Sequence, residues 1–171
     1  MDFFETVDKR RSTRAFQEKE VDIKTIKQIL DAVNLAPSAG GLQAYRISVV
    51  KSKKTKEELM LACLDQESVA QASVVFIFSA DKKQSEAKYE ARGYELYAVQ
   101  DATIAAAYCQ LAATALGLSS VWVGAFDPLE VSRLISAEPE EVPVAVIPVG
   151  YAAGMPGRTG RKQLKALVRE V

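Results

Sequence analysis

Apolar side chains recur every three or four residues along much of the chain, which is the spacing of one face of a helix. The first such stretch begins at Phe3 and leads into a basic cluster. The second spans 23–33, with Asp22 as its predicted N-cap and Pro37 beyond its end. Further helices are predicted over about 55–64, 94–116 and 128–134. Alanines on several faces of the 94–116 stretch predict a helix buried at the centre of the domain or at a subunit interface.

Shorter apolar runs alternate with these helices and predict strands over 47–50, 73–78, 121–123 and 144–149. The 73–78 run is continuously apolar, as in a central strand covered on both faces. Interleaved strands and helices predict a layered α+β or α/β fold around one sheet. No linker or repeat divides the chain, so we expect one domain over 1–171. The basic end, 161–171, is expected to lie on its own domain or to reach a partner.

The charge and composition exclude several classes of function. The 171 residues carry 22 basic and 22 acidic side chains, and they include no histidine. A neutral chain has no overall field to attract nucleic acid or a membrane, and a chain without histidine has no Ser-His-Asp triad or histidine-ligated metal. Cys63 and Cys109 are isolated, which predicts reduced core thiols rather than a metal site. No signal peptide or membrane span is evident, so we expect a cytoplasmic protein.

Three short segments of the sequence are candidates for a ligand-binding or catalytic role. The run Arg10, Arg11, Ser12, Thr13, Arg14 offers guanidinium groups and hydroxyls suited to a phosphate, although such runs are also common as solvated helix ends. The string PSAGGLQ at 37–43 would let backbone amides approach a flat ligand, or it is an ordinary loop. The string WVGA at 122–125 ends a predicted strand, where ligands often bind, or it serves core packing of Trp122. Without a histidine or a clustered nucleophile, an enzyme of this kind would use an organic cofactor.

Together these strings resemble the nitroreductase superfamily of FMN-dependent oxidoreductases. The resemblance is carried by KRRSTRAF, APSAGGLQAYRISVV, QDATIAAAYCQLAATALGLSSVWVGAFDP and VIPVGY, in this order over nearly the whole chain. It implies an α+β fold with a mixed central sheet flanked by helices. It also implies an intertwined homodimer that holds FMN at the subunit interface.

The resemblance assigns the cofactor-binding residues by motif. Arg10, Arg11, Ser12 and Arg14 match the phosphate and ribityl contacts, joined at the phosphate by Arg161 and Lys162 of the tail. Pro37, Ser38, Ala39 and Gly41 match the loop that a partner lays against the isoalloxazine, and Gln43 and Gln66 offer amide side chains nearby. Val123, Gly124 and Ala125 match the segment whose backbone amides approach flavin N5 and O4. No residue is expected to be catalytic in its own right, and no metal is expected.

The implied reaction is a ping-pong cycle. NADH or NADPH gives hydride to flavin N5, and a small-molecule acceptor such as a nitroaromatic, a quinone, an enone or free flavin then takes it. The chain departs from the NxQPW pattern of many members, because it has Gly41, Leu42, Gln43, Ala44 and Tyr45 there. It is also short between 81 and 94, which predicts no additional helical lid and an open pocket. The alternatives are an FMN-dependent dehydrogenase, dehalogenase or flavin-processing relative, and a non-catalytic dimeric scaffold.

Overall fold

The fold is seen in a computed structural model that describes residues 1–154 and 156–171. The helices are α1 (Phe3–Lys9), α2 (Ile23–Asn34), α3 (Lys53–Ala62), α4 (Glu67–Gln71), α5 (Lys82–Arg92), α6 (Ala98–Ala115) and α7 (Pro128–Ile135). The strands are β1 (Tyr45–Val50), β2 (Val74–Asp81), β3 (Ser119–Ser120) and β4 (Glu141–Gly150). Single turns of helix occur at η1 (Ala39–Gly41), η2 (Gly93–Tyr97) and η3 (Leu164–Ala166).

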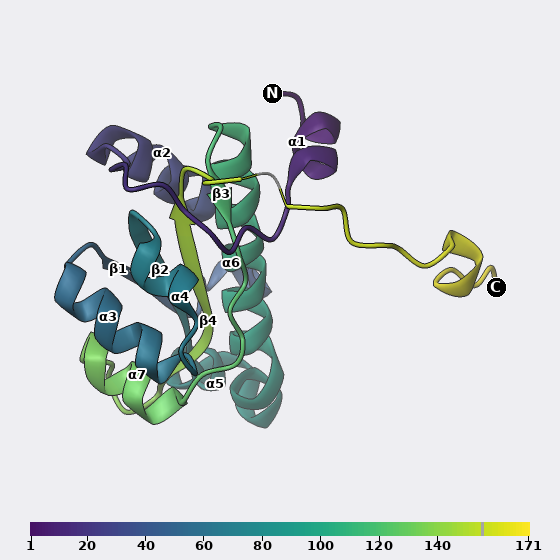
Figure 1. Cartoon of the computed structure of the whole chain (residues 1–171). Coiled ribbons are helices and arrows are strands. Elements are labelled where there is room, and N and C mark those ends of the chain that lie inside the picture. The colour runs from purple at the N-terminus through teal and green to yellow at the C-terminus, as the bar shows by residue number, and fades with distance from the viewer. Residues whose placement is uncertain (155) are drawn as a thin grey trace.

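The strands form one sheet in the order β1-β2-β4-β3, and every neighbouring pair is antiparallel. At its edge the chain adds a parallel bridge between Ser12 and Ser120. Helices cover both faces of the sheet (Figure 1). The predicted α+β fold with a mixed central sheet flanked by helices is therefore confirmed, and the parallel part of the sheet is the bridge at Ser12.

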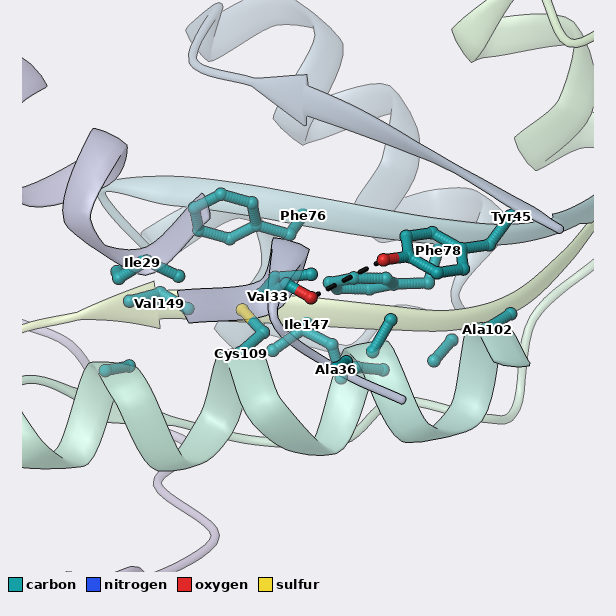
Figure 2. Close-up of a cluster of buried hydrophobic side chains, with 14 of the residues drawn as sticks. Ile29, Val33, Ala36, Tyr45, Phe76, Phe78, Ala102, Cys109, Ile147 and Val149 are labelled. Carbon is teal, nitrogen blue, oxygen red and sulfur yellow. Dashed lines mark hydrogen bonds between the residues drawn. The ribbon is translucent and has the colours of Figure 1, made fainter. Parts of the chain in front are cut away.

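Strand β2 is buried along its whole length and separates two apolar cores. Because side chains alternate along a strand, Phe76 and Phe78 face the core that contains α2 and α6, whereas Val75 and Ile77 face the core that contains α3 and α7. Figure 2 shows the first core, in which α6 lies beneath the sheet and the Tyr45 hydroxyl donates to the Val33 carbonyl at 3.4 Å. The prediction of a central strand is confirmed.

The small side chains of α6 let this helix pack closely against the sheet. Its buried face is formed by Ala98, Ala102, Ala105, Ala106, Cys109 and Ala113. Gly117 follows the helix with φ +79°, a left-handed conformation that glycine adopts at low cost, and it ends the helix as predicted. Cys63 and Cys109 are both free and fully buried, as expected of core thiols.

The predicted strand over 121–123 is wrong, because the regular pairing is at Ser119–Ser120 instead. Val121 and Val123 are buried and so gave an apolar pattern. Opposite Val121, however, β4 presents Pro148, which has no N–H to donate. Regular pairing therefore stops there, and Val123 adds only a single bridge to Val146.

The long helical segment predicted from Tyr94 is confirmed, although its first turn is π-helical rather than α-helical. Lys82–Arg92 forms α5, a π-helical turn follows at Gly93–Tyr97, and α6 begins at Ala98. Helix α5 buries only Ser85, so its sequence lacks an apolar stripe. Asp81 caps it by accepting from the Gln84 amide at 2.9 Å. The stretch that was expected to add no helical lid therefore forms a helix whose Lys88 and Tyr89 lie against Gly40 of the loop at 37–43.

Residues 156–171 lead away from the body of the domain, as the yellow segment of Figure 1 shows. Arg158 is ion-paired with Asp8 of α1 at 2.6 Å, which fixes the start of this arm. Beyond it, Leu164 and Leu167 are 77% and 64% exposed. The arm therefore does not fold back onto its own domain. In the described part of the chain, no helix has the length and apolar character needed to cross a membrane.

Candidate functional site

Four of the predicted phosphate-binding residues lie around one cavity. The cavity has a volume of about 510 Å³, and Arg10, Arg11, Ser12 and Arg161 line it together with Arg158. We call Arg10, Arg11, Ser12 and Arg161 together the guanidinium cluster. Among the residues that the structure describes, neither Arg10 nor Arg161 forms an ion pair. Asp8 also lines the cavity, but it is paired with Arg158, so Arg10 and Arg161 keep their positive charge without an ion-pair partner.

Local structure fixes the N-terminal part of this cluster. Asp2 and Glu5 form a reciprocal capping box that begins α1, and the helix ends just before Arg10. The Thr13 amide then donates to the Ser120 carbonyl at 3.0 Å, which holds the segment against the sheet edge. Arg11 donates to the Arg10 carbonyl at 2.9 Å, so part of its guanidinium is already engaged.

A second group of predicted residues meets farther along the same edge. The Gln66 amide donates to the Ala125 carbonyl at 3.1 Å and to the Cys63 carbonyl at 3.0 Å. The Val123 amide donates to Val146 at 2.9 Å and is therefore used by the sheet. In the described chain, the exposed amides of Gly124 and Ala125 have no such acceptor. They remain free to donate to a ligand, and we call them the free amides.

The predicted loop at 37–43 is held in shape by a buried carboxylate. Asp101 of α6 is 2% exposed and accepts from the Ala39 amide at 2.8 Å and from the Ala44 amide at 3.3 Å. Ser38 accepts from the Gln43 amide at 2.9 Å, which closes the loop on itself. Sequence reasoning missed Asp101, because an aspartate beside an alanine-rich run gives no sign of the distant amides it accepts from.

Two other residues at this loop were missed. The Tyr89 hydroxyl and the Lys88 ammonium of α5 crowd Gly40 so closely that a Cβ there would overlap both groups. Gly40 also has φ +56°, a left-handed conformation that favours glycine here. Tyr89 stacks edge-to-face on Tyr97, which lines a cavity of about 460 Å³ with Ala39. The loop therefore has an aromatic wall.

Within one chain these groups form two separate regions. The guanidinium cluster and the free amides follow one edge of the sheet, because the segment at 12–13 runs beside Ser120. Of the loop at 37–43, Ala39 lines a different cavity. Arg14 and Lys162 are exposed and line neither cavity, and the Gln43 side chain donates to Asn34 of its own chain.

Comparisons with known proteins show which family and which relatives this chain is similar to. The model of the nitroreductase family matches residues 7–151. A Methanothermobacter thermautotrophicus protein, provisionally named NADH dehydrogenase/NAD(P)H nitroreductase, is 34% identical over 92% of this chain and 81% of its own length. A Bacillus subtilis FMN reductase (NADPH) is 25% identical over 97% of this chain and 72% of its own length. The structure of B. megaterium NfrA2 superposes with a TM-score of 0.91 at 25% identity, over 99% of this chain and 74% of that one.

Proposed function

This chain belongs to the nitroreductase family, and from that premise we propose that it passes hydride from NADH or NADPH to small acceptors such as nitroaromatics and quinones. It is an FMN-dependent NAD(P)H oxidoreductase. One observation carries the proposal. The guanidinium cluster lies at one end of a sheet edge, and the free amides lie at the other end of the same edge.

The residues present suit FMN. A phosphate monoester carries nearly two negative charges at neutral pH, and the unpaired Arg10 and Arg161 offer complementary forks. Arg10, Arg11, Ser12 and Arg161 would hold the phosphate, with Lys162 and Arg14 exposed beside them. A fully extended chain rises about 3.3 Å per residue, so Gly124 lies at most roughly 13 Å from Ser120. A ligand with a phosphate at one end and a ring at the other matches such a site.

The protein itself contributes position and electrostatics. FMN, when bound, supplies the ring that accepts hydride from the donor and gives it to the acceptor. The Gly124 and Ala125 amides would donate to that ring and stabilise negative charge that develops on it. Gln66 holds the Ala125 carbonyl, so it orients the peptide that carries these donors. No titrating side chain is needed, which agrees with a chain that has no histidine.

A second copy of the chain would complete the site. Pro37, Ser38, Ala39 and Gly41 do not line the cavity of the guanidinium cluster, and Ala39 lines a different one. Large apolar side chains of α1 and the C-terminal arm are also exposed, including Phe4 at 81% and Leu164 at 77%. A homodimer would bury these side chains and bring one copy's loop to the other copy's cluster.

The first experiment is a visible absorbance spectrum of the purified protein with and without added FMN. We expect flavin bands that bleach anaerobically with NADH or NADPH, which would also identify the donor. Bands that neither donor bleaches would favour a related FMN-dependent dehydrogenase, dehalogenase or flavin-processing reaction. A protein that stays colourless after FMN addition would favour a non-catalytic scaffold.

The substitution Arg10→Ala tests the phosphate site directly. Loss of one charge-assisted hydrogen bond costs about 1.5–3 kcal/mol, so FMN affinity should fall by roughly 10- to 100-fold. Arg133→Ala is the matched control, because Arg133 is exposed and ion-paired with Glu130 at 2.9 Å on α7. Fluorescence titration with FMN measures both. Equal affinities for the two variants would contradict the assignment of the phosphate site.

A further inference from the structure

A second cavity lined by cations lies at the opposite end of α4 from Gln66. Its volume is about 460 Å³. Three separate segments line it: 16–20, which follows the guanidinium cluster; 51–56, where β1 passes into α3; and 70–73, where α4 passes into β2. Nothing in the proposed flavin site uses these residues.

The lining carries an excess of positive charge. Lys19, Lys51, Lys53 and Lys56 line the cavity, against two carboxylates from Glu18 and Glu20. In the described ranges, none of the four lysines lies within ion-pair distance of a carboxylate. The whole chain has zero net charge, so this is a local concentration of cations. The charges of Glu20 and Glu57 act on Lys56 from a distance, but an anion entering the cavity would find ammonium groups that are not held in ion pairs.

The walls of the cavity are fixed by packing and hydrogen bonds. Phe16 is 7% exposed and Ala72 is fully buried, and both line it. The Lys56 ammonium donates to the Ala72 carbonyl, and the Val21 amide donates to the Ser73 hydroxyl at 2.6 Å. Burial lowers the pKa of the Lys56 ammonium, so this cation is incompletely solvated. It would therefore gain more from an anionic partner than a fully hydrated lysine would.

Lys19 is also held in place on the other side of the cavity. Its ammonium lies 3.9 Å from the centre of the Tyr151 ring, a cation–π contact. Two of the four cations, Lys19 and Lys56, are thus oriented by contacts to the body of the domain. Lys51 and Lys53 are exposed and can close on a ligand from the rim.

We propose that this cavity binds a phosphate-bearing small molecule, with the four lysines as its counter-ions. Four ammonium groups against two carboxylates match a ligand of about two negative charges. The phosphate could belong to a free phosphorylated metabolite or to the dinucleotide donor. Helix α4 has five residues, so about 7.5 Å of helix separates this cavity from Gln66 of the flavin site. Only the dinucleotide source rests on the proposed function.

The test uses the protein loaded with FMN, so that the guanidinium cluster is occupied. Inorganic pyrophosphate is titrated by calorimetry and thermal unfolding at an ionic strength held constant with NaCl. Saturating pyrophosphate should raise the Tm of the wild type by about 3 °C or more. In the double variant Lys53→Gln/Lys56→Gln, its affinity should fall about tenfold or more, because two charge contacts are lost.

Lys54→Gln is the matched control. Lys54 is on the same turn of α3, but it faces Glu58 at 3.9 Å and does not line the cavity. Its pyrophosphate affinity should equal that of the wild type. The proposal is overturned if pyrophosphate stabilises the wild type no more than NaCl does, or if the double variant binds it as tightly as the control does.

Steady-state kinetics of the double variant distinguish the two sources. If the KM rises about fivefold or more for NADPH but not for NADH, the cavity binds the additional phosphate that NADPH carries and NADH lacks. A similar rise for both assigns it to the pyrophosphate they share. Unchanged KM values with lost pyrophosphate binding assign it to a free phosphorylated compound. If the protein takes up no FMN, the proposed function fails, but the cavity can still be tested by titrating the flavin-free variants with pyrophosphate. All of these variants retain Arg10, so binding at the guanidinium cluster is the same in each and any difference in affinity comes from the cavity.

Discussion

At the scale of single residues, Asp101 links the long helix to the loop that carries part of the proposed site. Its two carboxylate oxygens accept from the amides of Ala39 and Ala44, and its side chain is almost fully buried. A buried carboxylate is stabilised only where its hydrogen bonds are satisfied. The shape of the loop therefore depends on one charge supplied by a helix about sixty residues away in sequence.

The substitution Asp101→Asn tests this dependence. The amide would present an N–H group to a backbone N–H, so one charge-assisted bond is lost and stability should fall by about 1–3 kcal/mol. Urea unfolding at fixed protein concentration measures the change. Asp31→Asn is the control, since Asp31 is exposed and paired with Lys27 on α2, and it should change stability by about 0.5 kcal/mol or less. Equal effects of the two variants would contradict the role of Asp101.

Cys63 gives the protein a pH-dependent stability. Burial raises the pKa of its thiol from 9.0 to about 11. The unfolded thiol therefore ionises at lower pH than the folded one, so the stability that this thiol contributes is complete below pH 9 and is lost as the pH rises from about 9 to 11. Urea unfolding at several pH values should show this decline, and Cys63→Ala should make it shallower. A variant with the same pH dependence as the wild type would assign the decline to other groups.

At the scale of elements, α7 shows how a local signal and a tertiary contact combine. Asp127 caps this helix by accepting from the amides of Leu129 and Glu130 at 2.9 and 3.2 Å, and Pro128 occupies the first turn. The Asp127 amide donates to the Ala62 carbonyl at 2.8 Å, which ties the helix to α3. The free amides of Gly124 and Ala125 lie just before this anchor, so the start of α7 limits their movement.

The substitution Asp127→Ala measures the contribution of this cap. Loss of an N-cap costs about 1 kcal/mol, so the Tm should fall by about 2–4 °C. Glu58→Ala on the exposed face of α3 serves as a control with little expected effect, because its contact with Lys54 is 3.9 Å long. Differential scanning calorimetry compares the two. A Tm of Asp127→Ala equal to that of the control would show that the cap is dispensable.

At the scale of the whole molecule, the distribution of the proposed site over two copies can be tested by mixing. One variant, Arg10→Ala, weakens the guanidinium cluster, and another, Ala39→Trp, fills the cavity at the loop. Each alone should have little activity when FMN is supplied at a concentration that saturates the wild type but not Arg10→Ala. If the copies re-assort at random, half of the dimers are mixed and each has one intact site, so about a quarter of the sites recover. NAD(P)H oxidation by the refolded mixture measures this recovery, and no recovery would contradict a site shared between copies.

The sequence by itself determined which segments form regular structure and which residues carry charge. The spacing of apolar residues and the helix-capping residues predicted α1, α2, α7 and β2 correctly, because hydrophobic periodicity and local hydrogen bonds act over a few residues. The basic run at 10–14 was identified for the same reason, since side-chain chemistry is visible in the sequence. The helical stretch at 82–92 was missed because it has no apolar stripe and its packing partners lie elsewhere in the chain.

Only the tertiary structure decided which of these residues meet. It brought Arg161 to Arg10 across about 150 residues, joined Gln66 to Ala125, and placed Asp101 under the loop. It also showed that the Val123 amide is used by the sheet while the next two amides are free. Such contacts depend on how helices and strands pack around β2. A periodic pattern records which face of an element is buried, but it does not record which distant segment lies against that face.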